Sequence, residues 1–401
     1  MKEKKKNKAD YISLKDSRKI IKYNMKQMKF YEARKRRKVD PKEYTSVMRD
    51  ENNIIEIDGL KTCFFTDVGT VMSVNGVSFD IPKNKIVGVV GESGCGKSVT
   101  SFSIMQLVQA PQGQIVDGAI RFNTDELGKD ENGNKLCYDI AKMPMTEMYK
   151  IRGKDITMIF QEPMTSLNPV FTIGSQLDEV TFLHSPEMPK ADVKAYSIEM
   201  LARVGISMPE HVYSSYPHEL SGGMRQRVMI AMAIAGRPKL IIADEPTTAL
   251  DVTIQAQILE LMRELQKQDG CSIMLITHDL GVIAEMADEV VVMYAGRVIE
   301  RGTVQDIFLN PLHPYTIGLQ KSKPLIDSDS NEPLYSIPGQ VPNPINLPDA
   351  CYFKGRCTRC TAACDGCYPQ TVKVSDTHSV ACYLYRDGLG QSPEPVGNEQ
   401  K

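Results

Sequence analysis

Hydrophobic and polar positions along the chain follow two different periods. Four continuous apolar runs predict buried strands, because a strand covered on both faces loses its polar alternation. They lie at 86–90, 156–160, 240–243 and 272–276. Three stretches with apolar residues at helical spacing predict helices, at 191–204, 222–235 and 253–269. Strands and helices that follow one another in this way predict an α/β fold with a mostly parallel sheet.

A glycine-rich loop joins the first apolar run to the helical segment that follows it. Residues 91–98 read Gly-Glu-Ser-Gly-Cys-Gly-Lys-Ser. Between a strand and a helix, such a loop turns its backbone amides onto phosphates, Lys97 neutralises the β and γ oxygens, and Ser98 ligates Mg²⁺. We interpret Cys95 as a small residue at a variable position and not as a nucleophile. The predicted ATP-binding residues here are Gly91, Ser93, Gly94, Cys95, Gly96, Lys97, Ser98 and Val99.

Polar residues suited to hydrolysis follow the other three apolar runs. Asp244 and Glu245 end the third run and fit a Mg²⁺ ligand and the general base that polarises the attacking water. His278 follows the fourth run, where it can hydrogen-bond the γ-phosphate, and Gln161 follows the second run as another Mg²⁺ contact. The sequence therefore predicts Glu245, His278 and Gln161 as the catalytic group. It predicts Ser98, Gln161 and Asp244 as the Mg²⁺ site.

A serine and glycine motif opens the predicted helix at 222–235. Residues 220–227 read Leu-Ser-Gly-Gly-Met-Arg-Gln-Arg. The Ser221 hydroxyl and the Gly222 and Gly223 amides lie at the positive end of this helix and form an anion site. Because the motif lies far along the chain from Lys97, we expect it to serve a nucleotide held by a partner subunit. The residues predicted to contact the partner's ATP are Ser221, Gly222, Gly223 and Gln226.

The order of these motifs resembles the ATP-binding-cassette (ABC) ATPases. Six motifs follow one another between residues 91 and 278. They are the phosphate loop, Gln161, the signature motif at 220–227, the acidic strand end, the loop at 248–251 and His278. The resemblance implies ATP hydrolysis by an ABC-type nucleotide-binding domain with a mostly parallel sheet core, an antiparallel β subdomain and a helical subdomain. Strands expected at 54–60 and 71–79 resemble the antiparallel subdomain. There Phe64 takes the place of the aromatic that stacks on adenine, with Phe65 as the alternative.

Three further stretches resemble the oligopeptide, dipeptide and nickel importer branch of this family, and most closely its D-type oligopeptide permease ATPases. Gln161 continues as Glu-Pro-Met-Thr-Ser-Leu-Asn-Pro, and residues 313–316 and 337–342 resemble that branch's carboxyl-terminal extension. The resemblance implies a subunit that energises oligopeptide uptake as a heterodimer with a second, F-type ATPase. It also implies two integral membrane permease subunits and an extracellular peptide-binding protein.

Two alternatives to oligopeptide import stay open on the sequence. The same machinery could carry dipeptides or nickel, because the permeases and the binding protein set the substrate. The other alternative is a soluble ABC ATPase that works without a permease. Such proteins carry a long coiled coil or two complete cassettes, and this sequence has one cassette and no coiled coil.

Six of the ten cysteines lie between residues 351 and 382. In the expected cytosolic setting thiols stay reduced, which favours a metal centre over disulfides. The spacing of Cys357, Cys360, Cys364 and Cys367 permits Zn²⁺. The family resemblance instead implies a [4Fe–4S] cluster, with zinc or no metal as alternatives; its four ligands would be Cys351, Cys357, Cys364 and Cys382. This centre follows the cassette far along the chain, with no phosphate-binding group nearby, so we expect it to be structural and to take no part in hydrolysis.

Charge divides the chain into unlike parts. Residues 1–50 hold 18 Lys or Arg against 7 Asp or Glu, a net charge of +11, whereas the remainder has a net charge of −13. A basic extension suits an anionic membrane surface, an acidic partner or nucleic acid, of which nucleic acid is the least favoured, and a solvated tail is the alternative. The segment 20–31 mixes apolar and basic residues as an interfacial helix does.

Composition and hydropathy complete the expected organisation. The chain is 42% hydrophobic and 24% charged, which is typical of a globular protein. It contains no apolar run long enough to span a bilayer and no apolar stretch behind its first lysines that would form a secretory signal. We therefore expect a peripheral protein at the cytoplasmic face of the cell membrane, held there by permeases. Three parts are predicted: a basic extension at 1–50, the ABC ATPase domain at 51–310 and a cysteine-bearing extension at 311–401.

Overall fold

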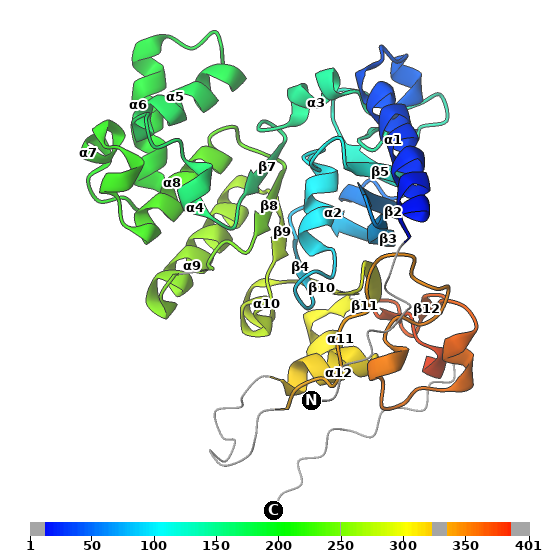
Figure 1. The fold of residues 1–401 in the computed structure, drawn as a ribbon. Helices are drawn as coiled ribbons and strands as arrows, with labels where there is room; N and C mark the ends of the chain where they lie inside the picture. The colour runs from blue at the N-terminus through cyan, green and yellow to red at the C-terminus, as the bar shows by residue number, and fades with distance from the viewer. Residues whose placement is uncertain (1–12, 249, 323–334, 386–401) are drawn as a thin grey trace, which may run out of the picture.

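The computed structural model describes residues 13–248, 250–322 and 335–385. A lobe of helices, a central sheet and an antiparallel sheet with a long helix lie side by side, and the carboxyl-terminal region lies below the last two (Figure 1). No helix within the described ranges is both long and apolar enough to cross a membrane.

The central sheet contains the four predicted buried strands as neighbours. In the described part of the chain its order is β12-β13-β11-β10-β4-β9-β8-β7. The four apolar runs become β4 (Ile86–Val90), β7 (Ile156–Ile159), β8 (Leu240–Asp244) and β9 (Ser272–Ile276), which pair in parallel. Strand β10 (Glu289–Tyr294) pairs in parallel with β4, and the antiparallel edge is formed by β11 (Arg297–Thr303), β13 (Ser379–Val380) and β12 (Val372–Lys373). The predicted parallel core is confirmed.

Helices cover this sheet and build the helical lobe. The predicted helices are confirmed within two residues as α6 (Lys190–Arg203), α8 (Gly222–Ile234) and α9 (Val252–Asp269). Beside α6 and α8, the lobe contains α4 (Pro163–Ser166), α5 (Ile173–His184) and α7 (Pro209–Ser214). The remaining α-helices of the core and its carboxyl side are α2 (Lys97–Ile104), α3 (Met145–Ile151), α10 (Leu280–Met286), α11 (Val304–Leu309) and α12 (Pro314–Lys321).

The antiparallel sheet has the order β1-β6-β5-β2-β3. Its long hairpin, β2 (Asn53–Thr66) and β3 (Gly69–Pro82), contains both predicted strands and extends beyond them. Strand β5 (Gly113–Asn123) pairs with β2, and β6 (Leu136–Asp139) joins β5 to β1 (Thr45–Val47). Because β1 lies within the first 50 residues, part of the basic extension belongs to this sheet.

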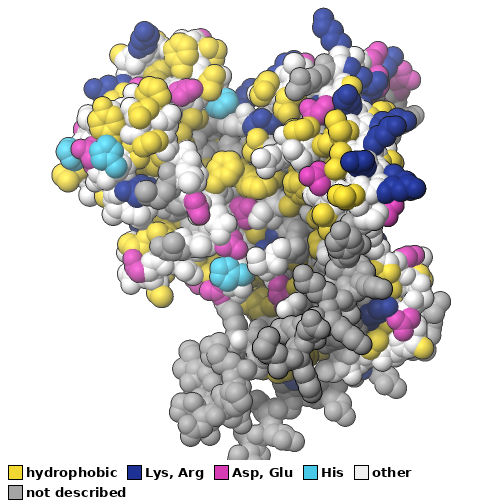
Figure 2. All heavy atoms as spheres, viewed as in Figure 1, with side chains coloured by type: hydrophobic (Ala, Val, Ile, Leu, Met, Phe, Trp, Pro, Cys, Tyr) yellow, Lys and Arg dark blue, Asp and Glu magenta, His cyan; other side chains and the backbone are white. Residues whose placement is uncertain are grey.

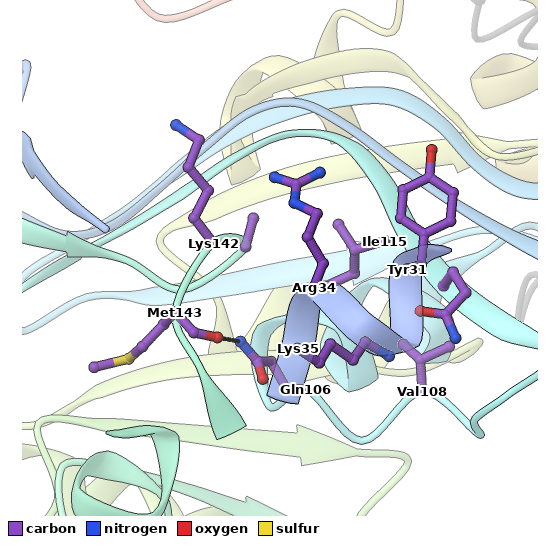
Figure 3. A pocket seen from close by; sticks show the side chains of 10 residues that line it. Tyr31, Arg34, Lys35, Gln106, Val108, Ile115, Lys142 and Met143 are labelled. Atoms are coloured by element: carbon purple, nitrogen blue, oxygen red, sulfur yellow. Dashed lines mark hydrogen bonds between the residues drawn. The ribbon is translucent and has the colours of Figure 1, made fainter. Parts of the chain in front are cut away.

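Most of the described basic extension forms helix α1 (Leu14–Arg36), which packs on the antiparallel sheet. The Asn24 side chain is 2% exposed and donates hydrogen bonds to the carbonyls of Thr66 (2.7 Å) and Gly69 (3.5 Å). Near the end of the helix, Tyr31 and Lys35 border a small pocket that Gln106 also lines (Figure 3). The outer face of α1 carries the cations that form the basic patch in Figure 2.

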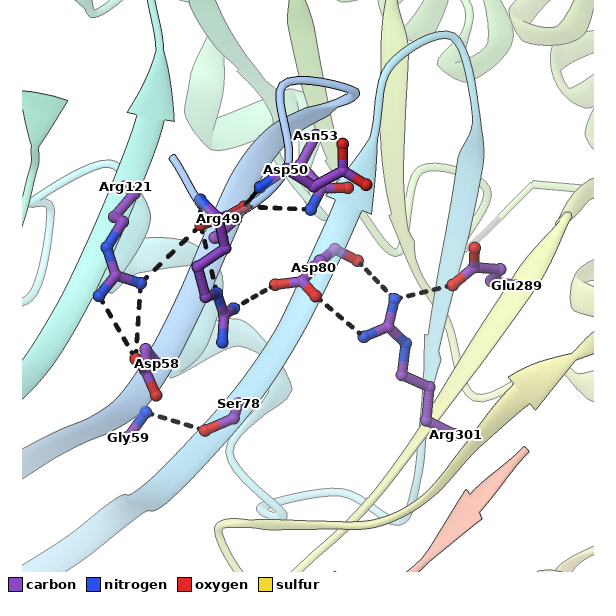
Figure 4. A network of polar contacts seen from close by, with 11 residues as sticks. Arg49, Asp50, Asn53, Asp58, Gly59, Ser78, Asp80, Arg121, Glu289 and Arg301 are labelled. Carbon is purple, nitrogen blue, oxygen red and sulfur yellow. Dashed lines mark hydrogen bonds and ion pairs between the residues drawn. The ribbon is translucent and has the colours of Figure 1, made fainter. Parts of the chain in front are cut away.

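A network of ion pairs ties the antiparallel sheet to the central sheet (Figure 4). Asp80 on β3 accepts from Arg49 (2.6 Å) and from Arg301 of β11 (3.5 Å), and Arg301 also donates to Glu289 of β10 (2.9 Å). Burial raises the pKa of Asp80, and the two arginines oppose that shift. The network fixes the antiparallel sheet relative to the strand β4 that feeds the glycine-rich loop.

Candidate functional site

The loop at 91–98 has a backbone that only glycine accommodates at two positions. A Cβ atom on Gly91 (φ 152°) would lie 2.2 Å from the carbonyl oxygen of Met293, and one on Gly96 (φ 100°) would lie 2.4 Å from that of Ser73. Lys97 begins helix α2 and is 7% exposed, and its Nζ donates to the carbonyls of Gly91 (2.7 Å) and Glu92 (3.2 Å). The loop therefore closes around an ammonium group at a helix N-terminus, an arrangement suited to phosphate.

Two of the three predicted Mg²⁺ ligands touch one another beside this loop. The Ser98 hydroxyl donates to Oδ1 of Asp244 at 3.1 Å, and Asp244 is 3% exposed at the end of β8. Burial raises the pKa of Asp244, whereas the hydrogen bond from Ser98 lowers it. Hydroxyl and carboxylate oxygens are suitable ligands for Mg²⁺. The third predicted ligand, Gln161, donates to Glu245 at 3.0 Å and so lies next to this pair.

The Glu245 carboxylate brings the predicted catalytic residues together. Its Oε2 accepts from Nε2 of Gln161 (3.0 Å) and from the Thr248 hydroxyl (2.9 Å), and its Oε1 lies 3.2 Å from Nδ1 of His278. Glu245 has a φ of 48°, in a region that non-glycine residues seldom occupy. Three residues that are far apart in sequence thus meet at one oxygen pair. The hydrogen bond from Thr248 was not predicted, although the loop containing Thr248 was singled out in the sequence.

The two candidate adenine-stacking aromatics face opposite sides of β2. Phe65 is 6% exposed, and its ring stacks on Tyr31 of α1 with centroids 6.3 Å apart and an interplanar angle of 20°. Phe64 is only half-buried, and neighbouring Thr62 contacts Ser103 of α2 at 2.8 Å on the side away from α1. Helix α1 therefore occupies the face of Phe65, and Phe64 lies on the side of the phosphate-loop helix.

The signature motif forms the exposed start of α8 in the helical lobe. Ser221 is the N-cap residue, and its hydroxyl accepts from the Met224 amide at 3.3 Å. Ser221 and Gly222 are exposed, so their polar groups are open to a second molecule. Gln226, which the sequence groups with them, differs because its side chain is 1% exposed and points into the packed side of the helix. Its Nε2 has no hydrogen-bond partner among the described residues.

An apolar groove of about 800 Å³ separates the helical lobe from the core. Figure 2 shows apolar side chains in the hollow between the two upper lobes. Leu183 of α5 (70% exposed), Tyr149 of α3 (65%) and Phe160 (37%) are large side chains that border it. Exposed apolar side chains gathered in a concave site mark a binding surface for a protein, a membrane or another ligand.

The cysteine-rich region contains six free cysteines that differ in burial. Cys364 is 8% exposed, and its carbonyl accepts from the Cys351 amide at 3.0 Å. Burial raises the pKa of Cys382 to about 12, with smaller contributions from the charges of Cys351, Cys357 and Cys364. The exposed Cys367 lies 3.0 Å from the Tyr383 hydroxyl instead. Within the described ranges, no group of three or more His, Cys, Asp or Glu side chains is arranged to hold a metal ion.

The carboxyl-terminal extension reaches the phosphate loop, although the sequence places no phosphate-binding group near its cysteines. The Tyr315 hydroxyl accepts from the Glu92 amide at 2.8 Å, and Arg356 makes two hydrogen bonds to the Glu92 carboxylate, at 2.7 and 3.0 Å. Arg356 immediately precedes Cys357, one of the clustered cysteines. Distance along the chain was a poor guide because the extension folds back onto β10 and the loop after β4.

Two family descriptions match the chain. The family described as ABC transporter matches residues 74–248, and the one described as oligopeptide/dipeptide transporter, C-terminal region, matches residues 299–364. The first match covers the phosphate loop, signature and acidic strand, and the second includes the segment that reaches back to the loop.

Several curated proteins are similar over most of this chain. The oligopeptide transport ATP-binding protein AppD of Bacillus subtilis is 48% identical over 342 residues, which are 85% of this chain and 100% of the relative. The dipeptide transport ATP-binding protein DppD of the same organism is 48% identical, over 82% of this chain and 94% of its own. The oligopeptide transport ATP-binding protein OppD of Salmonella typhimurium is 45% identical, over 81% and 92%.

Solved structures match the cassette part of the fold. The dimeric bacterial ABC transporter cassette MJ0796 is 25% identical with a TM-score of 0.52, over 62% of this chain and 98% of its own. The protein cbiO1 from Clostridium perfringens, at 24% identity and a TM-score of 0.51, shares the fold over 64% of this chain and 91% of its own. Two of these curated relatives are 48% identical to this chain over nearly their full length. This similarity, together with the two family matches, shows that this chain belongs to the ATP-binding subunits of the oligopeptide and dipeptide ABC transporters.

Proposed function

We propose that this chain hydrolyses ATP as one half of a heterodimeric ATPase pair and so drives oligopeptide uptake from the cytoplasmic face of the cell membrane. The observation that carries this proposal is the Glu245 carboxylate, which joins Gln161 and His278 next to the Ser98–Asp244 pair. The relatives named for oligopeptide transport support the choice of cargo.

Each part of the site has a role in this proposal. Lys97 and the amides of residues 91–98 bind the phosphates, and Phe64 stacks on the adenine. Ser98, Asp244 and Gln161 would hold Mg²⁺ through their side-chain oxygens, and the ion would supply positive charge for the phosphates. Glu245 orients and deprotonates the attacking water, and His278 contacts the γ-phosphate.

Closure of two such cassettes on ATP would transmit force to the membrane subunits. ATP makes its contacts with the partner's signature motif only in the closed dimer, so binding shifts the population toward closure, and hydrolysis reverses the shift. The apolar groove between α5 and the core is the proposed dock for the two permeases, because it combines exposed apolar side chains with a position between the two moving lobes. An extracellular peptide-binding protein would deliver cargo to those permeases.

If each ATP site is built from the phosphate loop of one subunit and the signature motif of the other, a mutation in this chain's signature motif should affect the two sites unequally. Ser221→Arg places a bulky cation at the exposed N-terminus of α8. In a complex with an intact second ATPase, nucleotide trapping at the partner's phosphate loop should fall about 100-fold, as when one oxyanion donor is lost. Trapping at the site that contains Lys97 should be less affected. Photo-labelling of each subunit with an ATP analogue measures the two sites separately.

A serine of a neighbouring helix supplies the matched control. Ser214 is exposed on α7, so Ser214→Arg adds the same charge to the helical lobe away from the signature motif. This variant should trap nucleotide at both sites as the unmodified complex does. Loss at the Lys97 site with trapping preserved at the partner's phosphate loop would contradict the cross-dimer arrangement.

For the cysteine-rich region we propose a structural [4Fe–4S] centre held by Cys351, Cys357, Cys364 and Cys382. The hydrogen bond from the Cys351 amide to the Cys364 carbonyl (3.0 Å) brings two of these four residues together and supports the ligand set. In a cluster each thiolate binds a different iron, so the ligands stand farther apart than those of a single ion. There are two alternatives. One is zinc bound by Cys357, Cys360, Cys364 and Cys367, and the other is a fold without metal.

Metal analysis separates these alternatives. Anaerobic purification should yield brown protein with about four irons per chain, and Cys364→Ser should remove the colour and lower the thermal stability of the extension. Cys367→Ser, at an exposed cysteine, should keep the colour. Colourless protein with one zinc per chain would support the zinc alternative, and protein free of both metals would exclude a metal centre.

Cargo is the part of the proposal that depends most on other subunits. The similarity to a dipeptide transport ATP-binding protein keeps dipeptides as the second candidate, and nickel follows from the same branch of the family. Uptake of labelled tripeptide, dipeptide and Ni²⁺ by cells with and without this chain discriminates between them. Loss of nickel uptake alone would rule out peptides as the cargo.

A further inference from the structure

We propose that Arg356 of the carboxyl-terminal extension is a positioning residue of the ATP site, which acts by holding Glu92 of the phosphate loop. The proposal rests on the assignment of residues 91–98 as the phosphate loop. It concerns a contact between parts of the chain separated by 264 positions, and it gives the extension a direct effect on ATP affinity.

Every donor of the Arg356 guanidinium has an acceptor. Nη1 donates to Oε2 of Glu92 (2.7 Å) and to the Tyr294 hydroxyl (3.4 Å), and Nη2 donates to Oε1 of Glu92 (3.0 Å) and to the Ile337 carbonyl (3.3 Å). Nε donates to the Pro338 carbonyl at 2.9 Å. A guanidinium carries five N–H groups in a fixed fork, so these five contacts use all of them. Lysine has three donors and no fork and cannot reproduce this arrangement.

The surroundings of Arg356 keep it in one position. Its side chain is 7% exposed, and its guanidinium carbon lies 5.8 Å from the ring centre of Tyr294 and 6.0 Å from that of Phe353. Gly339 has a φ of 78°, and a Cβ atom there would lie 3.2 Å from Cγ of Arg356. A cation held so firmly, and paired with a largely shielded carboxylate, contributes more than a mobile surface ion pair does.

Glu92 makes three contacts, through its amide, its carbonyl and its carboxylate. Each contact restrains the first turn of the phosphate loop. The Glu92 amide donates to Tyr315, its carbonyl accepts from Lys97, and its carboxylate is paired with Arg356. Two of these three partners come from the carboxyl-terminal extension. Without Arg356, a free carboxylate would lie within the loop that must bind the negative phosphates of ATP. Repulsion and greater loop mobility would then both lower ATP affinity.

Arg356→Gln should therefore raise the Kd of the full-length chain for MgATP about tenfold, as expected when one member of a shielded charge pair is removed. In the complete transporter, the KM for ATP should rise about tenfold, while kcat at saturating ATP stays within about twofold because Glu245 is untouched. Calorimetric titration measures Kd, and steady-state hydrolysis measures KM and kcat.

The second substitution, Glu92→Gln, distinguishes positioning from a general role in folding. In the double variant Arg356→Gln/Glu92→Gln the unpaired charge is absent, so the Kd should return to within about threefold of the unmodified value. If the double variant binds ATP as weakly as Arg356→Gln does, the proposal is overturned. Should Arg356→Gln fail to fold, Arg356→Lys supports the same comparison, with a smaller expected loss.

Lys354→Gln is the matched control, because Lys354 lies two residues away and pairs with Asp365 at the surface. It should leave the Kd unchanged, and a loss equal to that of Arg356→Gln would overturn the proposal. Unchanged ATP binding by Arg356→Gln would also overturn it. Normal ATP binding by Lys97→Ala would instead refute the phosphate-loop assignment, so the two failures are distinguishable.

Discussion

Glu245→Gln should reduce kcat for ATP hydrolysis by about 100- to 10,000-fold, the usual contribution of a general base. ATP affinity should change little, because glutamine keeps the shape of glutamate and the phosphate contacts of Lys97 remain. Gln161 and Thr248 donate to Glu245 Oε2, and the amide oxygen of the variant can still accept from them. Since ATP binds but is not consumed, a closed dimer should accumulate, and size-exclusion chromatography with MgATP would detect it.

The control for this variant is a carboxylate on an exposed surface. Glu260 lies on the exposed face of α9, so Glu260→Gln removes the same charge at a distance from the loop. It should hydrolyse ATP at the unmodified rate. Near-normal steady-state hydrolysis by Glu245→Gln would exclude Glu245 as the base.

Lys97→Ala should raise the Kd for MgATP by at least about tenfold and thereby lower the rate of hydrolysis at subsaturating ATP. Lys97 is 7% exposed, and its ammonium lies against the carbonyls of Gly91 and Glu92, so its removal deprives the loop of its main counter-charge. Calorimetry gives the Kd directly, and loss of affinity with an intact fold by circular dichroism is the expected combination.

Lys85 provides the comparison for Lys97. It precedes β4 at the end of the strand opposite the phosphate loop and pairs with Asp288 at 3.0 Å in a largely exposed ion pair. Lys85→Ala should cost less than about 1 kcal/mol of stability and leave ATP affinity unchanged. If both lysine variants lost ATP affinity equally, a nonspecific charge effect would explain the result.

Sequence reasoning succeeded where the chemistry is local. The strand, glycine-rich loop and helix around Lys97 are consecutive, so their periodicity and residue types predict their structure directly. The position of Glu245 was also predictable, because a polar residue that follows a buried parallel strand lies at the carboxyl edge of the sheet. Gln161 follows β7 and His278 follows β9, the two parallel strands on either side of β8, so their meeting at Glu245 follows from the shared direction of these strands.

Long-range packing determines the environments of the residues for which the sequence prediction was incomplete. Phe64 and Phe65 are adjacent and chemically alike, so only the docking of α1, with Tyr31 on Phe65, separates their environments. Gln226 lies one helical turn from the exposed signature residues, yet it is buried because helix α8 turns that face toward the packed side of the lobe. Neither result is encoded in a local pattern.

By itself the sequence determined the α/β class, the order of the motifs and the residues that meet at Glu245, because each depends on short-range periodicity and on side-chain chemistry. Only the tertiary structure decided that the carboxyl-terminal extension touches the phosphate loop through Tyr315 and Arg356. A contact between residues 92 and 356 leaves no periodic trace. It exists because the chain folds back over β10 and aligns a guanidinium fork with a carboxylate, a match of geometry that only the folded chain creates.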